Sequence, residues 1–238
     1  MATIKMKPSS SLPDVMILCG GLGTRLRPVV SDRPKPMADV QGKPFLELLI
    51  THLVDQGVKR IILCAGYMGN MIEDYFSRHA FGVDIKVVIE PSPLDTAGAV
   101  KHALPFVRDD SFIVINGDSF CDYKLSALVQ THIQKKATAS IYATYVNDAT
   151  KFGTLELSEQ GAFISAFKEK GYTGAGWVNA GAYMFGKELF KDLPVLTRVS
   201  LEQDVFPKIP REQLIAYLGE ESFVDIGSPD DYHRFQQI

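Results

Sequence analysis

The segment at residues 15–27 constrains this chain more than any other, because an apolar run breaks there into closely spaced glycines and a basic stretch. Residues 15–18 are continuously apolar, as expected of a parallel strand covered on both faces. Gly20, Gly21 and Gly23 remove Cβ atoms where the backbone must turn, and this leaves amide groups free to face anionic oxygens. The segment predicts a buried strand that leads into a phosphate-binding loop.

Positive charge follows the glycines, carried by Arg25, Arg27, Arg33 and Lys35. Residues 24–27 are predicted to open a helix, whose N-terminal dipole would add to the attraction for phosphate. Residues 32–37 contain two prolines and are predicted to be extended. The spacing lacks the Lys-Ser/Thr end of a P-loop and the full dinucleotide fingerprint, so a glycine turn that serves only chain reversal is still an alternative at this point.

Length and charge narrow the class of protein. The 238 residues are enough for one large domain or two small ones, and we expect one α/β domain. The net charge of -3 gives no reason to expect a nucleic-acid partner, and no apolar run reaches the roughly 18 residues that a membrane span needs. Residues 1–13 lack the apolar centre of a signal peptide and are expected to be a disordered leader or a cloning remnant.

The cysteines and histidines show no metal-binding spacing. Cys19, Cys64 and Cys121 are odd in number and lie in apolar or strand-like stretches. The five histidines are scattered, and no pair has the spacing of zinc ligands. We therefore expect free thiols in a reducing cytosol, which predicts a cytoplasmic protein.

Strands and helices alternate through the first half of the chain. Apolar runs predict strands at residues 60–66, 85–89 and 111–118, and helical spacing predicts helices that begin at residue 42 and span residues 70–79 and 96–104. This order implies right-handed crossovers and a parallel sheet, in which ligands bind beyond the carboxyl ends of the strands. The glycine loop, Glu90 and Asp118 all fall at those ends.

The second half of the chain has a different pattern. Strands are predicted at residues 137–146, 151–157, 163–167, 177–185, 214–218 and 223–227, with short helices at residues 201–206 and after Ser228. Some of these strands are expected to be antiparallel. The whole chain therefore predicts an α/β, Rossmann-like fold with a mixed, mostly parallel central sheet flanked by helices.

Two aspartates, Asp118 and Asp225, stand at predicted strand ends beside the glycine loop. Mg²⁺ commonly takes one or two carboxylates and completes its octahedral shell with phosphate oxygens and water. The pair therefore predicts the Mg²⁺ site of a phosphate-handling enzyme. Aspartates that serve only a turn are the alternative for each residue taken alone.

Together these motifs resemble those of the sugar-1-phosphate nucleotidylyltransferases. The family pattern G-G-x-G-T-R-L-x-P, followed by P-K-P-M and G-K-P, occurs here at residues 20–28, 34–37 and 42–44. Further matches lie at residues 93–99, 116–118, 168–170, 179–183 and 224–227. The resemblance implies one domain at residues 14–238, with a nucleotide-binding half at residues 14–120 and a sugar-phosphate-binding half at residues 121–238. No appended β-helix domain is expected.

The resemblance also implies roles for individual residues. Arg25 and Lys35 would neutralise the leaving pyrophosphate. Asp118 and Asp225 would hold Mg²⁺. Nucleotide binding is implied for Leu18, Gly20, Gly21, Gly23, Thr24, Arg25, Lys35, Glu90, Pro93, Thr96, Gly98 and Asp118. Sugar-phosphate binding is implied for Asn116, Glu169, Lys170, Asn179 and Gly181.

Glu90 falls where members of this family have a residue that reads the nucleotide base. A carboxylate accepts hydrogen bonds and donates none, and guanine offers adjacent N–H and NH₂ donors that the thymine edge lacks. The resemblance therefore favours GTP, while the alternative for Glu90 is a carboxylate that only fixes the loop at residues 91–95. Asp95 departs from the family, which usually has glycine there, and this raises the prospect of a different loop shape.

Residues 171–177 and 200–207 most resemble the subgroup that transfers GMP to D-glycero-α-D-manno-heptose 1-phosphate. The implied products are GDP-heptose, for bacterial lipopolysaccharide or capsule, and pyrophosphate. Guanylyl, thymidylyl, cytidylyl or uridylyl transfer to mannose, glucose or N-acetylmuramate 1-phosphate stays open, as does a non-catalytic nucleotide-sugar sensor. A homodimer is expected from the resemblance alone.

Overall fold

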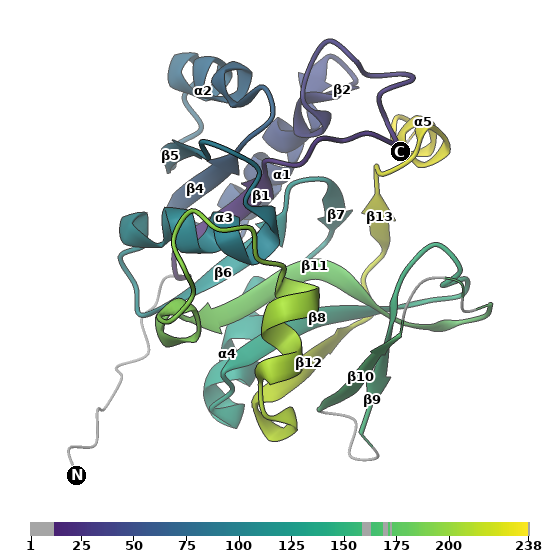
Figure 1. Ribbon diagram of the computed structural model, residues 1–238. Coiled ribbons are helices and arrows are strands. Elements are labelled where there is room, and N and C mark those ends of the chain that lie inside the picture. Colours follow the sequence, from purple (N-terminus) through teal and green to yellow (C-terminus); the bar gives the residue numbers. More distant parts are fainter. Residues whose placement is uncertain (1–11, 159–162, 169–170, 172, 238) are drawn as a thin grey trace.

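A computed structural model describes residues 12–158, 163–168, 171 and 173–237 (Figure 1). Among these residues, one nine-stranded sheet runs through the molecule and helices pack on both of its faces. The strand order from one edge is β10, β9, β11, β6, β1, β4 and β5, and β8 lies between β11 and β12. The predicted α/β architecture with a mixed sheet is confirmed. Residues 1–11 of the predicted leader lie outside the described residues.

The parallel half of the sheet contains β1 (Val15–Cys19), β4 (Arg60–Ala65), β5 (Asp84–Ile89) and β6 (Ser111–Asn116). The helices that connect these strands are α1 (Phe45–Asp55), α2 (Gly69–Arg78) and α3 (Asp95–Ala103). Leu18 of β1 is level with Cys64 of β4 and with Asn116 of β6. The strands therefore end at one common edge, where the predicted glycine loop begins.

The other half of the sheet contains β8 (Ala139–Val146), β9 (Thr154–Leu157), β10 (Ile164–Lys168), β11 (Gly176–Gly186) and β12 (Leu214–Gly219). Strand β11 is antiparallel to β6, β8 and β9, while β12 is parallel to β8. Two short antiparallel pairs lie outside this sheet. They are β7 (Ser119–Cys121) with β13 (Phe223–Asp225), and β2 (Asp39–Val40) with β3 (Lys43–Pro44).

Successive residues of β1 point to opposite faces of the sheet, because side chains alternate along a strand. Met16 belongs to a core cluster on the face that α3 covers. Val15 and Ile17 belong to a second cluster, which includes residues of α1, α2 and α4 (Leu125–Lys135). Both faces of β1 are therefore buried, as its continuous apolar run predicts.

A third and smaller apolar cluster joins the two ends of the chain. It includes Leu26, just after the glycine loop, with Ile226, just after β13, and Phe235 of helix α5 (Pro229–Phe235). Leu26 and Ile226 are fully buried. Ser228 caps α5, since its hydroxyl oxygen accepts a hydrogen bond from Asp231 N. The packing of this cluster holds the basic segment after the glycines beside the C-terminal strand.

The predicted helix at residues 24–27 is wrong, because successive turns occupy this segment instead. Leu26 N donates to the carbonyl of Gly23, and Val30 N donates to the carbonyl of Leu26. Pro28 has no N–H to continue a helical ladder. The predicted helix at residue 42 begins only at Phe45, since residues 43–44 pair as a strand.

Residues 32–37 are extended only in part. Pro34 is extended, with ψ 148°, but Lys35–Met37 form a 3₁₀ turn that the fixed φ of Pro36 fits. Helix α4 is not among the predicted elements. The predicted short helix at residues 201–206 is a π-helical turn at Leu201–Val205, and further 3₁₀ turns span Leu104–Phe106, Lys187–Phe190, Phe206–Lys208 and Arg211–Gln213.

All three cysteines are buried as free thiols, as the sequence predicts. Burial, and after it the charge of Glu90, raise the pKa of the Cys64 thiol to about 12. None of the helices in the described part of the chain has both the length and the apolar character needed to cross a membrane.

Candidate nucleotide and sugar-phosphate site

The glycine loop follows β1 at the carboxyl edge of the parallel strands. Gly23 has φ +58°, in the left-handed region that favours glycine, and a Cβ there would lie 2.9 Å from Lys35 Cβ. A Cβ on Gly20 would lie 2.6 Å from Glu90 Oε1, whereas Gly21 faces open space. The loop is therefore shaped around Lys35 and Glu90, which argues against a turn that serves only chain reversal.

Lys35, Asp118 and Asp225 form a charged centre at this edge. Lys35 Nζ lies 2.8 Å from Asp118 Oδ2 and 3.3 Å from Asp225 Oδ1, and the lysine side chain is only 8% exposed. Strand β13 brings Asp225 to this point by pairing with β7, opposite Ser119. Ile226 N also donates to the carbonyl of Asp118 at 3.1 Å. One buried ammonium group thus bridges carboxylates from the middle and the end of the chain.

The electrostatics of Asp225 favour a cation beside it. Burial raises the pKa of its carboxyl above the ordinary value, the Lys35 ammonium lowers it, and the charge of Asp118 raises it again. Arg25 lowers this pKa too, and Arg25 Nη2 would lie 3.0 Å from a Cβ on Gly227. An ionised Asp225 is therefore stabilised mainly by positive charge.

The two carboxylates fit a Mg²⁺ ion, because they already share one positively charged group. Mg²⁺ needs only one or two protein carboxylates when phosphate oxygens and water complete its shell. No group of three or more His, Cys, Asp or Glu residues in the described ranges could hold a metal ion by itself. The donor set of Asp118 and Asp225 therefore suits an ion that arrives with a phosphate ligand.

Glu90 closes the other side of the glycine loop. Its Oε2 accepts a hydrogen bond from Leu94 N at 3.2 Å, so the carboxylate does fix the loop that follows β5. Its Oε1 lies against Gly20 and Gly66, where any Cβ would collide with it. Burial raises the pKa of Glu90, while the Leu94 hydrogen bond lowers it. One carboxylate oxygen thus holds the loop, and the other faces the glycines.

Asp95 takes the backbone conformation that glycine favours. Its φ is +61°, in the left-handed region, which Asp tolerates better than most residues. Its Oδ2 lies 3.4 Å from Arg198 Nε. The departure from glycine at this position therefore does not by itself require another backbone shape.

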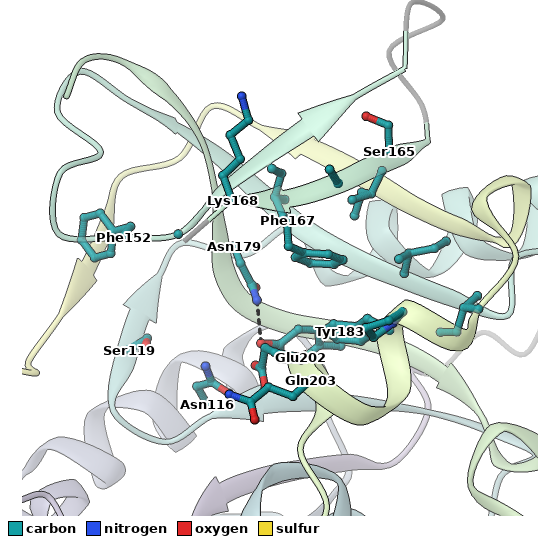
Figure 2. Close-up of a pocket in the computed structure, with 18 of the residues that line it drawn as sticks. Asn116, Ser119, Phe152, Ser165, Phe167, Lys168, Asn179, Tyr183, Glu202 and Gln203 are labelled. Carbon is teal, nitrogen blue, oxygen red and sulfur yellow. Dashed lines mark hydrogen bonds between the residues drawn. The ribbon is translucent and has the colours of Figure 1, made fainter. Parts of the chain in front are cut away.

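A cleft of about 980 Å³ opens beside Asp118 and Asp225, between β9, β10 and β11 and the turns around residues 202–211. Figure 2 shows Asn116, Asn179, Tyr183, Glu202 and Gln203 gathered at one end of it. Asn179 Nδ2 donates to Tyr183 Oη at 2.8 Å, and Asn179 Oδ1 accepts from the amide of Gly181 at 2.9 Å. This end of the cleft presents hydrogen-bonding groups suited to a hydroxyl-rich molecule.

Mostly apolar side chains line the rest of the cleft, together with Ser165, Lys168 and Arg211. The rings of Phe167 and Phe206 stack there with centroids 5.3 Å apart. The charged centre lies at its margin, since both Asp118 and Asp225 are lining residues. The cleft and the glycine loop therefore meet at the Lys35 centre.

The structure brings most of the predicted site residues to these two regions. Leu18 contributes its carbonyl, which accepts from Gly117 N, while Thr24 and Pro93 are exposed. Gly181 lies against Asn116, since a Cβ on Gly181 would lie 2.9 Å from Asn116 Nδ2.

Two groups of predicted residues stand apart from this arrangement. Thr96 and Gly98 belong to the first turns of α3, and the segment at residues 197–201 occupies their polar groups. Glu169 and Lys170 lie outside the described residues.

Most residues that line the cleft were not among the predicted site residues, and Tyr183, Glu202, Gln203 and Phe167 are examples. Tyr183 ends a motif that matched the family, and residues 200–207 matched the subgroup, so local similarity marked both regions without identifying a role. Glu202 and Gln203 follow a single buried leucine in a short turn, and a turn of that length has no periodicity from which the direction of its side chains can be inferred.

Comparisons with known proteins agree with this geometry. The model of the nucleotidyl transferase family matches residues 14–238. The D-glycero-alpha-D-manno-heptose 1-phosphate guanylyltransferase of Campylobacter jejuni subsp. jejuni serotype O:2 is 38% identical over 220 residues, which cover 92% of this chain and 97% of the relative. The protein of the same name from Aneurinibacillus thermoaerophilus is 36% identical and covers 94% and 97%.

Among solved structures, HddC from Yersinia pseudotuberculosis complexed with GMP-PN superposes with a TM-score of 0.87. It is 36% identical in sequence, and the match covers 95% of this chain and 99% of HddC. The likeness therefore extends over both the glycine-loop region and the cleft.

Lys35→Met should destabilise the protein in a pH-dependent way. The pKa of Asp225 is already raised by burial, so ionising this carboxyl costs stability above its folded-state pKa and costs nothing below the ordinary value of about 4. Loss of the ammonium group raises that pKa further. We expect the free energy of unfolding to fall by about 1–2 kcal/mol at neutral pH, a modest loss because Asp118 is partly screened by water. The loss should be smaller near pH 4, because the carboxyl of Asp225 then binds a proton.

Urea unfolding of the wild-type protein and the variant at the two pH values measures this difference. Lys43→Met is the matched control, since Lys43 is exposed and forms an ion pair with Glu47 in the first turn of α1. A loss that is equal at both pH values, or no larger than that of the control, would contradict the role given to Lys35.

Proposed function

Because this chain belongs to the nucleotidyl transferase family, we propose that it transfers GMP from GTP to D-glycero-α-D-manno-heptose 1-phosphate and releases pyrophosphate. The relatives that carry this name match the chain over nearly their full length. The observation that carries the proposal is the position of the Lys35 centre, between a glycine loop and a polar cleft. Two phosphorylated substrates could meet there with their reacting groups beside the charges.

In this reaction an oxygen of the sugar phosphate attacks the α-phosphorus of GTP. A new P–O bond forms as the bond to the β-phosphate oxygen breaks, and pyrophosphate leaves with the electron pair. The attacking oxygen is already ionised, so the chemistry needs orientation and charge neutralisation rather than a strong base. Arg25 and Lys35 are suited to neutralise the leaving pyrophosphate, and the amides of the glycine loop are suited to orient it.

Asp118 and Asp225 would hold the Mg²⁺ ion that completes the site. When bound, such an ion neutralises phosphate charge and aligns the two substrates. The carboxylates are held ready for a cation, because Lys35 already draws them together. Nucleotide binding would then free Lys35 to turn its ammonium group toward phosphate oxygens.

Glu90 would read the guanine base. Its position against Gly20 and Gly66 leaves a carboxylate oxygen at the wall of the glycine-loop region, where it can accept hydrogen bonds from adjacent N–H donors. The hydrogen bond from Leu94 holds the other oxygen in place. The two roles considered for Glu90 in the sequence, base reading and loop fixing, are therefore compatible.

We also propose a cytoplasmic location and a role in supplying GDP-heptose for a bacterial surface polysaccharide. The three free and buried thiols are consistent with a reducing compartment. The proposal of a homodimer rests on the family resemblance.

The reaction itself can be tested with a panel of substrates. The protein should release pyrophosphate when GTP, Mg²⁺ and D-glycero-α-D-manno-heptose 1-phosphate are supplied together, and mass spectrometry should identify GDP-heptose. Mannose, glucose and N-acetylmuramate 1-phosphates, and ATP, CTP, UTP and TTP, serve as comparisons. Dominant turnover of another pair would identify a different transferase, and no turnover with any pair would point to a nucleotide-sugar sensor.

Glu90→Gln should weaken the use of GTP selectively. Glutamine keeps an oxygen that can accept the Leu94 hydrogen bond, but it replaces the other oxygen with a donor that opposes the N–H groups of guanine. We expect kcat/KM for GTP to fall by about 100-fold, the scale of a mismatched polar contact. Steady-state kinetics at saturating sugar phosphate measure the effect, and an unchanged preference among the nucleotides would remove Glu90 from base recognition.

Asp118→Asn should abolish most of the turnover, because it removes one of the two carboxylates proposed to hold Mg²⁺. A loss of at least about 100-fold in kcat, or about 2.7 kcal/mol, is expected. Asp122→Asn is the control, since Asp122 is exposed and, among the described residues, its side chain forms ion pairs only with His52 and Lys124. Survival of turnover within about tenfold of the wild type would make the metal role wrong.

A further inference from the structure

Helix α3 and a later segment of the chain are fastened together by hydrogen bonds. We call residues 197–201 the strap. Ala97 N and Gly98 N both donate to the carbonyl of Val199, at 2.9 and 3.1 Å, and Val199 N donates to the carbonyl of Leu94. The amides of the first turns of a helix lack partners within the helix and often receive an anion. Here the strap occupies two of them.

The hydroxyl of Thr96 belongs to the same contact. Thr96 Oγ1 accepts a hydrogen bond from Leu201 N at 2.7 Å and donates to Glu202 Oε2 at 3.3 Å. A hydroxyl has one hydrogen to donate, so this donor is committed to Glu202. Thr96 therefore points its only side-chain donor toward the cleft, away from the role in nucleotide binding that the family resemblance implies.

Glu202 reaches the polar end of the cleft from this anchor. It lines the cleft, and Figure 2 shows it beside Tyr183, Gln203 and Asn116. Burial, and after it the negative charge of Glu202, raise the pKa of the Tyr183 phenol, which places the two groups within electrostatic reach. The charge of Asp118, which also lines the cleft, raises this pKa as well, after that of Glu202.

The two oxygens of Glu202 are used differently. Oε2 accepts from Thr96 Oγ1 and also from Ser200 Oγ at 3.2 Å. Within the described ranges, no hydrogen bond from the protein reaches Oε1. A carboxylate with one oxygen held and the other open can accept a hydrogen bond from a ligand hydroxyl without first losing the freedom of a mobile side chain.

We propose that Glu202 accepts a hydrogen bond from a hydroxyl of the sugar in the cleft and that Thr96 positions the Glu202 carboxylate. This inference rests on the proposed function, since it supposes that a sugar 1-phosphate occupies the cleft. It assigns the start of α3 to sugar recognition, although this helix directly follows the loop that Glu90 holds. A substitution of Thr96, in the first turn of α3, should therefore alter the use of the sugar phosphate.

Thr96→Val removes the hydroxyl and keeps the shape of the side chain. KM for D-glycero-α-D-manno-heptose 1-phosphate should rise about tenfold, the effect of losing one hydrogen bond that orders a charged group. KM for GTP should stay within about twofold. Thr96→Ser retains the hydroxyl and should restore most of the affinity for the sugar phosphate.

Glu202→Gln provides the second arm. It should raise KM for the sugar phosphate by a similar factor, and Thr96→Val should add little in the double variant, because Thr96 acts through Glu202. Thr197→Val is the matched control, since the Thr197 hydroxyl bonds only to the carbonyl of Val195 among the described residues. Thermal unfolding of every variant shows whether the strap has opened.

The outcomes separate this inference from the proposed function. A wild-type enzyme that neither binds nor consumes any sugar 1-phosphate, by calorimetry and by pyrophosphate release, would overturn both. An active wild-type enzyme in which Thr96→Val raises KM for GTP alone, or leaves both KM values unchanged, would overturn the inference only. Equal effects of Thr96→Val on its own and in the Glu202→Gln background would also overturn it.

Discussion

The parallel pairing of β1 with β4 and β6 is the constraint on which the whole site depends. It sets Leu18 level with Cys64 and Asn116, so the turns that follow these strands meet at one edge. Pairing of β4 with β5 brings Glu90 to the same edge. A shift of one residue in any pair would turn the buried side chains of that strand to the opposite face, so burial on both faces of β1 protects this alignment. The position of the functional groups is thus secured by the core rather than by the loops that carry them.

Charge is concentrated where that edge meets the cleft. A buried lysine is costly unless it is paired, and Lys35 is paired with two carboxylates. The carboxylates are in turn costly without a cation, since burial and mutual repulsion oppose the ionisation of Asp225. The centre is therefore balanced only while a positive group lies between the aspartates. This is a suitable state for a site that must receive a highly charged nucleotide with its metal and then release it.

Two contacts between distant segments complete the arrangement. The cluster of Leu26, Ile226 and Phe235 holds the basic segment near Asp225. The strap joins α3 to the turn that carries Glu202. Both contacts link the half of the chain that holds the glycine loop to the half that forms the cleft. The two proposed substrates would therefore be bound by elements that fold against each other, which favours a fixed distance between the reacting phosphates.

The sequence by itself determined the buried strands, the glycine loop and the candidate aspartates, because continuous apolar runs and the absence of Cβ atoms act locally. It also indicated the family, because the family motifs can be recognised in the sequence without knowledge of the tertiary structure. It misplaced the helix after the glycines, where Pro28 withholds a donor. Helix α4 was not predicted, although Leu125, Leu128 and Val129 recur at helical spacing. Only the tertiary structure decided that Lys35 lies between Asp118 and Asp225 and that Thr96 turns toward Glu202. The two residues of each contact are 83, 190 and 106 positions apart in the sequence for Lys35–Asp118, Lys35–Asp225 and Thr96–Glu202. Such pairings depend on strand register and core packing, which no local pattern encodes.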